Sequence, residues 1–121
     1  MSDEITEQIL AAAIEVHRVL GPGLLESIYE EALCREFELR NISFRRQISV
    51  DIEYKGIVIA GQRLDLLVEN EVIVEIKSIA KLPAVAMAQV LSYLRAMQLR
   101  RGLLINFGQN RLIDGVKRVS L

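Results

Sequence analysis

Two apolar stretches separated by a short polar segment constrain the fold of this chain more than any other feature. The stretches are residues 62–68 and 72–78, and the segment between them is Glu69–Glu71. Their composition and spacing predict two strands of a hairpin joined by a three-residue loop. If the chain reverses at the middle loop residue, Asp65 lies directly opposite Glu75, with their Cβ atoms roughly 5 Å apart.

Lys77 adds a third charged side chain to this pair, because residues two apart on a strand share a face and Lys77 follows Glu75 by two. Charges on a hairpin usually mark a solvated face, and that alternative requires the two acids to point into solvent or to opposite faces. A loop of another length would shift the register by one and separate the acids. The three-residue loop needs a left-handed residue, which Asn70 or a neighbour tolerates.

The neighbours of Glu75 are Val and Ile on both faces of the strand, so that both faces read as buried. Buried ionised groups are stable only when they are paired, hydrogen-bonded or bound to metal. Two facing carboxylates also repel each other, and a divalent cation removes that repulsion. The hairpin therefore predicts a metal site at Asp65 and Glu75, with Lys77 beside it.

Length and composition limit the class of protein. A chain of 121 residues that is 51% hydrophobic predicts one compact domain over residues 1–121. It has no apolar run of the roughly 18 residues that a membrane span needs. The acidic start Met1–Glu4 lacks the layout of a signal peptide, so a cytoplasmic location is expected. The formal net charge of −1 gives no overall basic excess for tight, non-specific binding of nucleic acid.

Periodicity divides the rest of the chain into helices and strands. Apolar residues recur at helical spacing in three segments, which are residues 5–20, 24–40 and 83–99. Further strands are expected at residues 47–54, from 57, at 103–107 and, along an edge, at 116–121. The first of these alternates apolar and polar residues, which is typical of a strand with one exposed face. The order predicts an α/β sandwich around a mixed sheet, with a bulge or bend at Gly61.

This order of elements, with an Asp followed by Glu-x-Lys on the hairpin, resembles the core of the PD-(D/E)xK nuclease superfamily. Residues 23–29, Gly-Leu-Leu-Glu-Ser-Ile-Tyr, resemble the signature that names the GxxExxY family. Residues 16–23 and 102–108 are also similar to that family, so the resemblance covers nearly the full chain. It implies a restriction-endonuclease-like core and a nuclease that hydrolyses DNA phosphodiester bonds with a metal-activated water.

The resemblance also implies roles for the hairpin residues. Asp65 and Glu75 would bind Mg²⁺ or Mn²⁺ together with the backbone carbonyl of Ile76. Lys77 would steady the attacking water or the charge that develops on the phosphate. These roles agree with the preference of hard divalent cations for oxygen ligands and with the use of a fixed positive group beside a reacting phosphate.

Three helical residues complete the implied site. Glu26 matches an acid that many members supply from the second helix, although an acid in a first helical turn is also favoured by the helix dipole alone. Gln89 and Tyr93 match the Gln-x-x-x-Tyr pattern of RecB-type nuclease domains. Gln89 lies on an otherwise apolar helical stripe, where a buried amide needs a polar partner.

Two departures from the family pattern support a second hypothesis. Leu64 stands before Asp65 where the superfamily pattern has proline, and Ala86-Met87 stands where a polar His-Glu pair is expected. A nuclease-like fold with weak or no catalysis could serve instead as a nucleic-acid or protein-binding module. The partners implied by the resemblance are DNA, with room for a homodimer or a protein partner, and no membrane.

Overall fold

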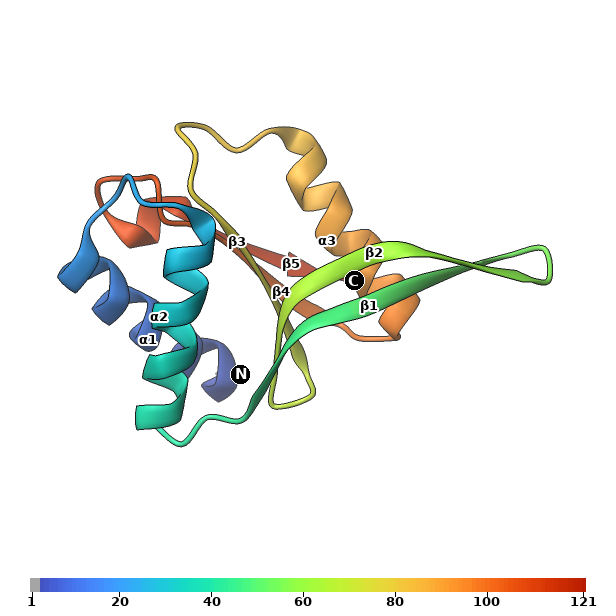
Figure 1. The fold of residues 1–121 in the computed structure, drawn as a ribbon, viewed down its shortest axis with the longest axis horizontal. Helices are drawn as coiled ribbons and strands as arrows, with labels where there is room; N and C mark the ends of the chain where they lie inside the picture. Colours follow the sequence, from blue (N-terminus) through green and yellow to red (C-terminus); the bar gives the residue numbers. More distant parts are fainter. Residues whose placement is uncertain (1–2) are drawn as a thin grey trace.

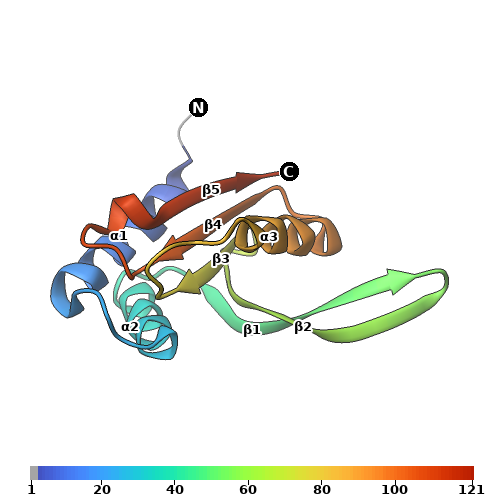
Figure 2. The same cartoon turned by 90° about the horizontal axis from the view of Figure 1, so that it is seen from above.

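The computed structural model describes residues 3–121, and Met1 and Ser2 of the acidic start lie outside the described residues. It shows a five-stranded sheet with helices packed on both faces (Figure 1, Figure 2). The elements in chain order are α1 (Glu4–Leu20), α2 (Glu26–Leu39), β1 (Phe44–Tyr54), β2 (Ile57–Val68), β3 (Val72–Lys77), α3 (Ala84–Met97), β4 (Arg101–Asn106), the 3₁₀ helix η1 (Leu112–Gly115) and β5 (Val116–Ser120). The predicted sandwich and element order are confirmed, including the last edge strand.

The sheet is mixed, as predicted, with the strands in the order β1-β2-β3-β4-β5. Only β3 and β4 are parallel, and α3 makes the crossover between them. The central strand β3 is buried from Val72 to Ile76, so both of its faces are covered. Among residues 3–121, no helix is both long and apolar enough to cross a membrane.

Each face of the sheet has its own core. Helices α1 and α2 cover one face, where Leu66, Val74 and Ile76 are buried with them. Helix α3 covers the other face, where Leu64 and Ile73 are buried. Apolar side chains on alternating faces of the central strands thus tie the two helical layers to one sheet.

Tyr29 has a structural role in residues 23–29, the segment that resembles the GxxExxY signature. Its ring stacks on Phe107 with the centroids 4.5 Å apart, and its side chain is fully buried. The hydroxyl donates to the carbonyl of Gly21 (2.5 Å) and accepts from the N–H of Leu24 (3.1 Å). Tyr29 therefore fixes the loop between α1 and α2, and with it the point at which α2 begins at Glu26.

Asn106 fixes the segment that follows β3. Its Oδ1 accepts from the N–H groups of Ile79 and Gly108, and its Nδ2 donates to the carbonyl of Ile79. A Cβ atom at Gly108 would lie 2.2 Å from the Ile79 carbonyl oxygen, so only glycine fits there. This contact holds the connector immediately after Lys77 against the end of β4.

The far ends of β1 and β2 leave the body of the protein as a two-stranded arm (Figure 1). The sequence predicted that one face of this segment is buried, and this is wrong beyond Val50: Ile52 is 36% exposed and Tyr54 is 56% exposed. The reason is that the strands extend past α3, which covers the sheet only as far as Val50. The predicted irregularity at Gly61 is confirmed, because the register of the two strands shifts after Val50.

Candidate functional site

The hairpin register places the two predicted acids opposite each other. The β2–β3 pairs are Leu66 with Val74, Leu67 with Ile73, and Val68 with Val72. The three-residue loop contains two left-handed residues, Glu69 (φ 53°) and Asn70 (φ 56°). The next positions along this register are Asp65 and Glu75, as the sequence predicted.

Asp65 and Glu75 lie just beyond the last regular residue pair of the β2–β3 ladder. Here their carboxylates, in place of backbone carbonyls, accept hydrogen bonds from the opposite strand. The N–H of Asp65 donates to Oε1 of Glu75 (2.7 Å), and the N–H of Ile76 donates to Oδ2 of Asp65 (2.9 Å). Each carboxylate is therefore bonded to the backbone of the opposite strand. This cross-bonding fixes both carboxylates between the two strands.

The alternation of side chains along β2 breaks at Asp65. Leu64 packs under α3 and Leu66 packs under α1 and α2, although residues two apart on a regular strand share a face. On β1, Gln47 lies across from Asp65 and has a left-handed backbone (φ 52°). The sequence predicted that the charged residues share one continuous face, and this is wrong for β2: Asp65 lies at a break, with Leu64 and Leu66 on opposite faces of the sheet.

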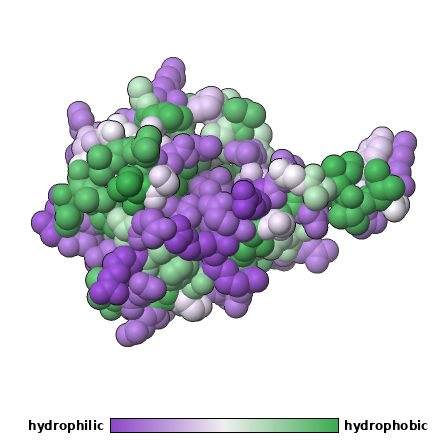
Figure 3. Space-filling view, in the orientation of Figure 1, coloured by the Kyte–Doolittle hydropathy of each residue, from purple (hydrophilic) through white to green (hydrophobic). Residues whose placement is uncertain are grey.

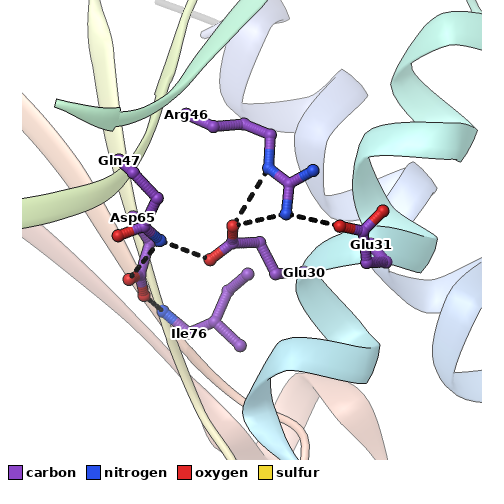
Figure 4. Close-up of polar contacts among 6 residues, drawn as sticks. All are labelled: Glu30, Glu31, Arg46, Gln47, Asp65 and Ile76. Carbon is purple, nitrogen blue, oxygen red and sulfur yellow. Dashed lines mark hydrogen bonds and ion pairs between the residues drawn. The ribbon is translucent and has the colours of Figure 1, made fainter.

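On the α2 side of this break, a polar network reaches Asp65 (Figure 4). Nε2 of Gln47 donates to Oε1 of Glu30 (2.8 Å) and, more weakly, to Oδ1 of Asp65 (3.4 Å). Arg46 donates through Nε (3.0 Å) and Nη2 (2.8 Å) to the other oxygen of Glu30, and it also pairs with Glu31. Glu30 is buried, and the two acids raise the pKa of Arg46.

Sequence reasoning missed Glu30, Arg46 and Gln47. Glu30 follows Glu26 by four residues and so lies on the same side of α2, one turn further along. The four-residue spacing from Glu26 was the one sequence signal that could have identified Glu30. The left-handed backbone of Gln47 had no signal in the sequence, because glutamine is not a residue that favours this conformation.

Burial raises the pKa of both hairpin acids. For Glu75 the pKa rises to about 8, because the carboxyl is buried and faces the charge of Asp65; Lys77 acts against this rise and Glu26 adds to it. The pKa of Asp65 is also raised, by burial and by the charge of Glu30, while the Ile76 N–H, Gln47 and Lys77 lower it. Lys77 and Glu26 are thus close enough to act on the pair electrostatically.

Helix α3 contributes Tyr93 and Gln89 to the same region. Tyr93 is buried, and its pKa is raised by that burial and by the charges of Glu75 and Asp65, while Gln89 lowers it. The two residues therefore interact with each other next to the acids. Ala86, one of the two departures from the family pattern, packs into the core under α3, and Met87 is 37% exposed.

The donor atoms present fit a hard divalent cation with partial protein coordination. Among residues 3–121, no three His, Cys, Asp or Glu side chains form a ready-made metal cage. Mg²⁺ commonly binds through one or two carboxylates and keeps waters and substrate phosphates as its other ligands. Asp65 and Glu75 each use one oxygen for a backbone N–H. The second oxygen of Asp65 accepts only the long hydrogen bond from Gln47 (3.4 Å), so a cation could bind there and at the second oxygen of Glu75. Two buried acids that repel each other gain stability from such a charge.

The backbone of Ile76 is oriented toward the same place. Its N–H points at Asp65, and in an extended strand the N–H and carbonyl of one residue face the same neighbour. The next carbonyl, that of Lys77, instead accepts from the N–H of Phe107 on the β4 side. The direction of the Ile76 carbonyl is thus consistent with the ligand role that the resemblance implied.

A mixed sheet between helices, with an Asp, a Glu and a Lys where two central strands separate, is consistent with a restriction-endonuclease-like fold. A family model for the PD-(D/E)XK nuclease superfamily matches residues 3–119, and the chain belongs to this superfamily. Comparison with curated proteins gives no match, and comparison with solved structures gives none. The narrower resemblance to the GxxExxY family stays a prediction.

Proposed function

We propose that residues 1–121 form one nuclease domain that hydrolyses DNA phosphodiester bonds and depends on Mg²⁺ or Mn²⁺. The observation that carries this proposal is the pair of a buried Glu75 and a half-buried Asp65, whose pKa values are both raised and whose neighbour on β3 is Lys77. Membership of the nuclease superfamily supports the same reaction class. Perturbed acids of this kind cluster at functional sites.

Asp65, Glu75 and the carbonyl of Ile76 would hold the cation. When bound, such a cation would supply activation of a water molecule and neutralisation of the charge on a reacting phosphate. The two backbone N–H bonds keep the carboxylates in position before substrate arrives. Glu75, whose pKa is about 8 without metal, would have to lose its proton to hold the cation, because a carboxylate binds metal in its deprotonated form.

The other residues act on the substrate or on the acids. Lys77 provides a fixed positive charge beside the phosphate, and its removal should reduce cleavage by about 10²–10³-fold. Glu26, at the exposed start of α2, stands where it can orient a water. On the α3 side, the half-buried Gln89 would offer a hydrogen bond to the nucleic-acid backbone, and the buried Tyr93 would hold Gln89 in place.

Gln47 and Glu30 are positioning residues in this proposal. Gln47 links Asp65 to Glu30, and Arg46 holds Glu30 through two hydrogen bonds. A left-handed non-glycine residue costs about 1 kcal/mol or more, and such strain is concentrated at functional sites. Through Gln47, this network from α2 would orient Oδ1 of Asp65, the oxygen that does not accept the N–H of Ile76.

Cleavage assays test the proposal. The full chain is incubated with single-stranded, nicked and branched DNA in Mn²⁺, Mg²⁺ or a chelator. We expect cleavage with either metal, and its loss in Asp65→Asn, Glu75→Gln and Lys77→Met. Glu71→Gln and Lys81→Met are matched controls, because both residues are exposed and lie four positions from Glu75 and Lys77 respectively. Intact DNA under every condition, or equal cleavage by Asp65→Asn, contradicts the proposal.

A second candidate function is a nucleic-acid or protein-binding module with little catalysis. The observation that favours it is Ala86, which packs into the core where the family pattern has a polar residue. The formal net charge of −1 also limits binding to the DNA backbone. This candidate predicts DNA or protein binding that is insensitive to Mn²⁺ and to Glu75→Gln. The cytoplasmic location and a protein partner likewise stay predictions.

A further inference from the structure

A strip of polar residues leads from the two acids onto the exposed part of β1 and β2. It consists of Gln47, Ser49 and Arg63, which are all exposed, and we call it the polar strip. Ser49 pairs with Arg63, so their side chains share a face of the two strands. The adjacent pair, Ile48 and Leu64, packs under α3, and neighbouring residues on a strand point to opposite faces. The polar strip therefore lies on the face opposite α3, which is the side of α2.

The polar strip is continuous with the acid site. Gln47 donates to Asp65 and to Glu30 of α2, so this end of the strip touches the site directly. Arg63 precedes Asp65 by two residues, which is about 7 Å along an extended strand. Figure 3 shows hydrophilic surface over the sheet between α2 and the arm. A molecule that reaches Asp65 can therefore extend along the strip without crossing apolar surface.

Arg63 carries a positive charge that no acid neutralises through an ion pair in the described chain. Every ion pair among residues 3–121 involves an arginine, and none involves Arg63. Arg46, which also lies on the α2 side of these strands, is held by Glu30 and Glu31. The formal net charge of −1 means that the chain as a whole does not attract phosphate, so a local cation has to do so.

A phosphate group matches the guanidinium of Arg63 at this place. Arginine binds two phosphate oxygens at once through parallel N–H groups, and its side chain is always charged. Successive phosphates of an extended nucleic-acid strand are separated by a distance similar to that between Arg63 and Asp65. A phosphate that reacts at Asp65 therefore brings the next phosphate of the strand within reach of Arg63.

We propose that Arg63 binds the phosphate next to the one that reacts at Asp65 and Glu75, so that the nucleic-acid strand leaves the site along the polar strip. This inference rests on the proposed function for the identity of the substrate, and it adds the path of the strand. Arg63 touches the substrate backbone and not the scissile bond. Phosphate contacts of this kind fix the register of a nucleic acid on a protein without reading its sequence.

Binding without cleavage tests this proposal. Fluorescence anisotropy measures the affinity of the full chain for a labelled single-stranded DNA oligonucleotide in a chelator, from about 50 to 200 mM salt. In Arg63→Gln we expect the salt dependence, log Kd against log salt, to be lower by about 0.7, and Kd to rise about 5-fold near 0.1 M salt, as for one lost phosphate contact. Arg63→Lys should keep the salt dependence, because the positive charge remains.

Arg100→Gln is the matched control for this binding assay. Arg100 is exposed, forms no ion pair among residues 3–121, and lies before the start of β4, at the opposite end of the β3–β4 pair from Lys77. Its substitution should change Kd by less than about 2-fold. Equal affinities of the wild type and Arg63→Gln, equal weakening by Arg63→Gln and Arg100→Gln, or a wild-type chain that binds no oligonucleotide overturns the proposal.

Cleavage kinetics with Mn²⁺ distinguish the path of the strand from the nuclease activity itself. Arg63→Gln should raise KM about 5-fold and leave kcat within about 2-fold, because Arg63 binds the substrate and not the reacting atoms. A neutral methylphosphonate linkage beside the cut one should raise KM for the wild type but not for Arg63→Gln. An unchanged KM in Arg63→Gln overturns the proposal and leaves the nuclease intact. A chain that cuts no DNA but loses affinity in Arg63→Gln contradicts the nuclease and supports phosphate binding by Arg63.

Discussion

Strands β1 and β2 differ at their two ends in opposite ways. At the end inside the body, their surroundings bury charged groups: Glu30 and Glu75 are buried and Asp65 is half-buried. At the end that forms the arm, the same two strands expose apolar groups such as Ile57 and Tyr54. Each end thus reverses the usual rule that apolar side chains lie inside and charges lie outside.

The two ends of these strands therefore carry different unfavourable features. The pKa values of Asp65 and Glu75 are raised although Lys77 lies nearby, and the divalent cation proposed above would add the positive charge that stabilises both carboxylates. Exposed apolar side chains on the two-stranded arm, in contrast, have no covering layer, because α3 covers the sheet only as far as Val50. Each end is costly in the isolated chain for its own physical reason.

The largest expected effect compares one residue type at the two places. Ile73 is fully buried in β3 and Ile57 is 58% exposed in the arm. Ile73→Ala should lower the free energy of unfolding by about 2–5 kcal/mol, through lost burial and a cavity. Ile57→Ala should change it by less than about 0.5 kcal/mol, because the side chain is largely exposed. Urea unfolding measures both, and similar losses would remove the contrast between body and arm.

The stability of the body should also depend on pH through Glu75. Its pKa is about 8 in the folded protein and 4.5 ordinarily, so between these values the folded chain binds more protons than the unfolded chain. The free energy of unfolding should therefore fall as pH rises from about 5 to 8, by up to about 1.4 kcal/mol per pH unit.

Asp65, whose pKa is also raised, adds to this trend in the same direction. Glu75→Gln removes a titrating group and should flatten the profile, whereas Glu71→Gln should leave it unchanged. Chemical unfolding at several pH values, without divalent metal, measures the slope. A wild-type stability that rises over this range would contradict the assignment of a protonated Glu75.

The smallest expected effect separates two neighbouring acids that bind the same arginine. Side chains of Glu30 and Glu31 are 10% and 70% exposed, and both pair with Arg46. Glu30→Gln should lower the free energy of unfolding by about 1–3 kcal/mol, because it disturbs a buried charged hydrogen-bond network. Glu31→Gln should cost at most about 0.5 kcal/mol, as expected for an exposed ion pair.

Activity distinguishes positioning from mere stability in the same pair of variants. Glu30→Gln should lower the cleavage rate and shift its pH profile, because Glu30 raises the pKa of Asp65. Glu31→Gln should leave both unchanged. Equal effects of the two substitutions on stability and on the pH profile would show that Glu30 does not position Asp65.

Sequence reasoning could predict the hairpin because its determinants are local. The loop length and the residues that tolerate left-handed backbone fix the register, and the register brings Asp65 opposite Glu75. The break at Gln47 and Asp65 could not be predicted, since it depends on which helical layer receives Leu64 and which receives Leu66. Local alternation contains no information on that choice.

The arm could not be predicted for a similar reason. Alternation from Ile48 to Tyr54 correctly indicated a strand with one apolar face. Whether that face is covered depends on where α3 lies relative to it, which is a tertiary property. The same limit applies to Arg46 and Glu30, which are distant in sequence and meet only because α2 packs against β1 at this point.

Isothermal calorimetry of Mn²⁺ binding at pH 7, repeated in buffers of different ionisation enthalpy, tests the central claim most directly. Glu75, with a pKa of about 8, is mostly protonated at that pH and must lose its proton to bind a cation. We predict one Mn²⁺ per chain with release of about one proton, and loss of binding in Asp65→Asn and Glu75→Gln but not in Glu71→Gln. Absence of binding, or binding that persists in Asp65→Asn without proton release, would contradict the account.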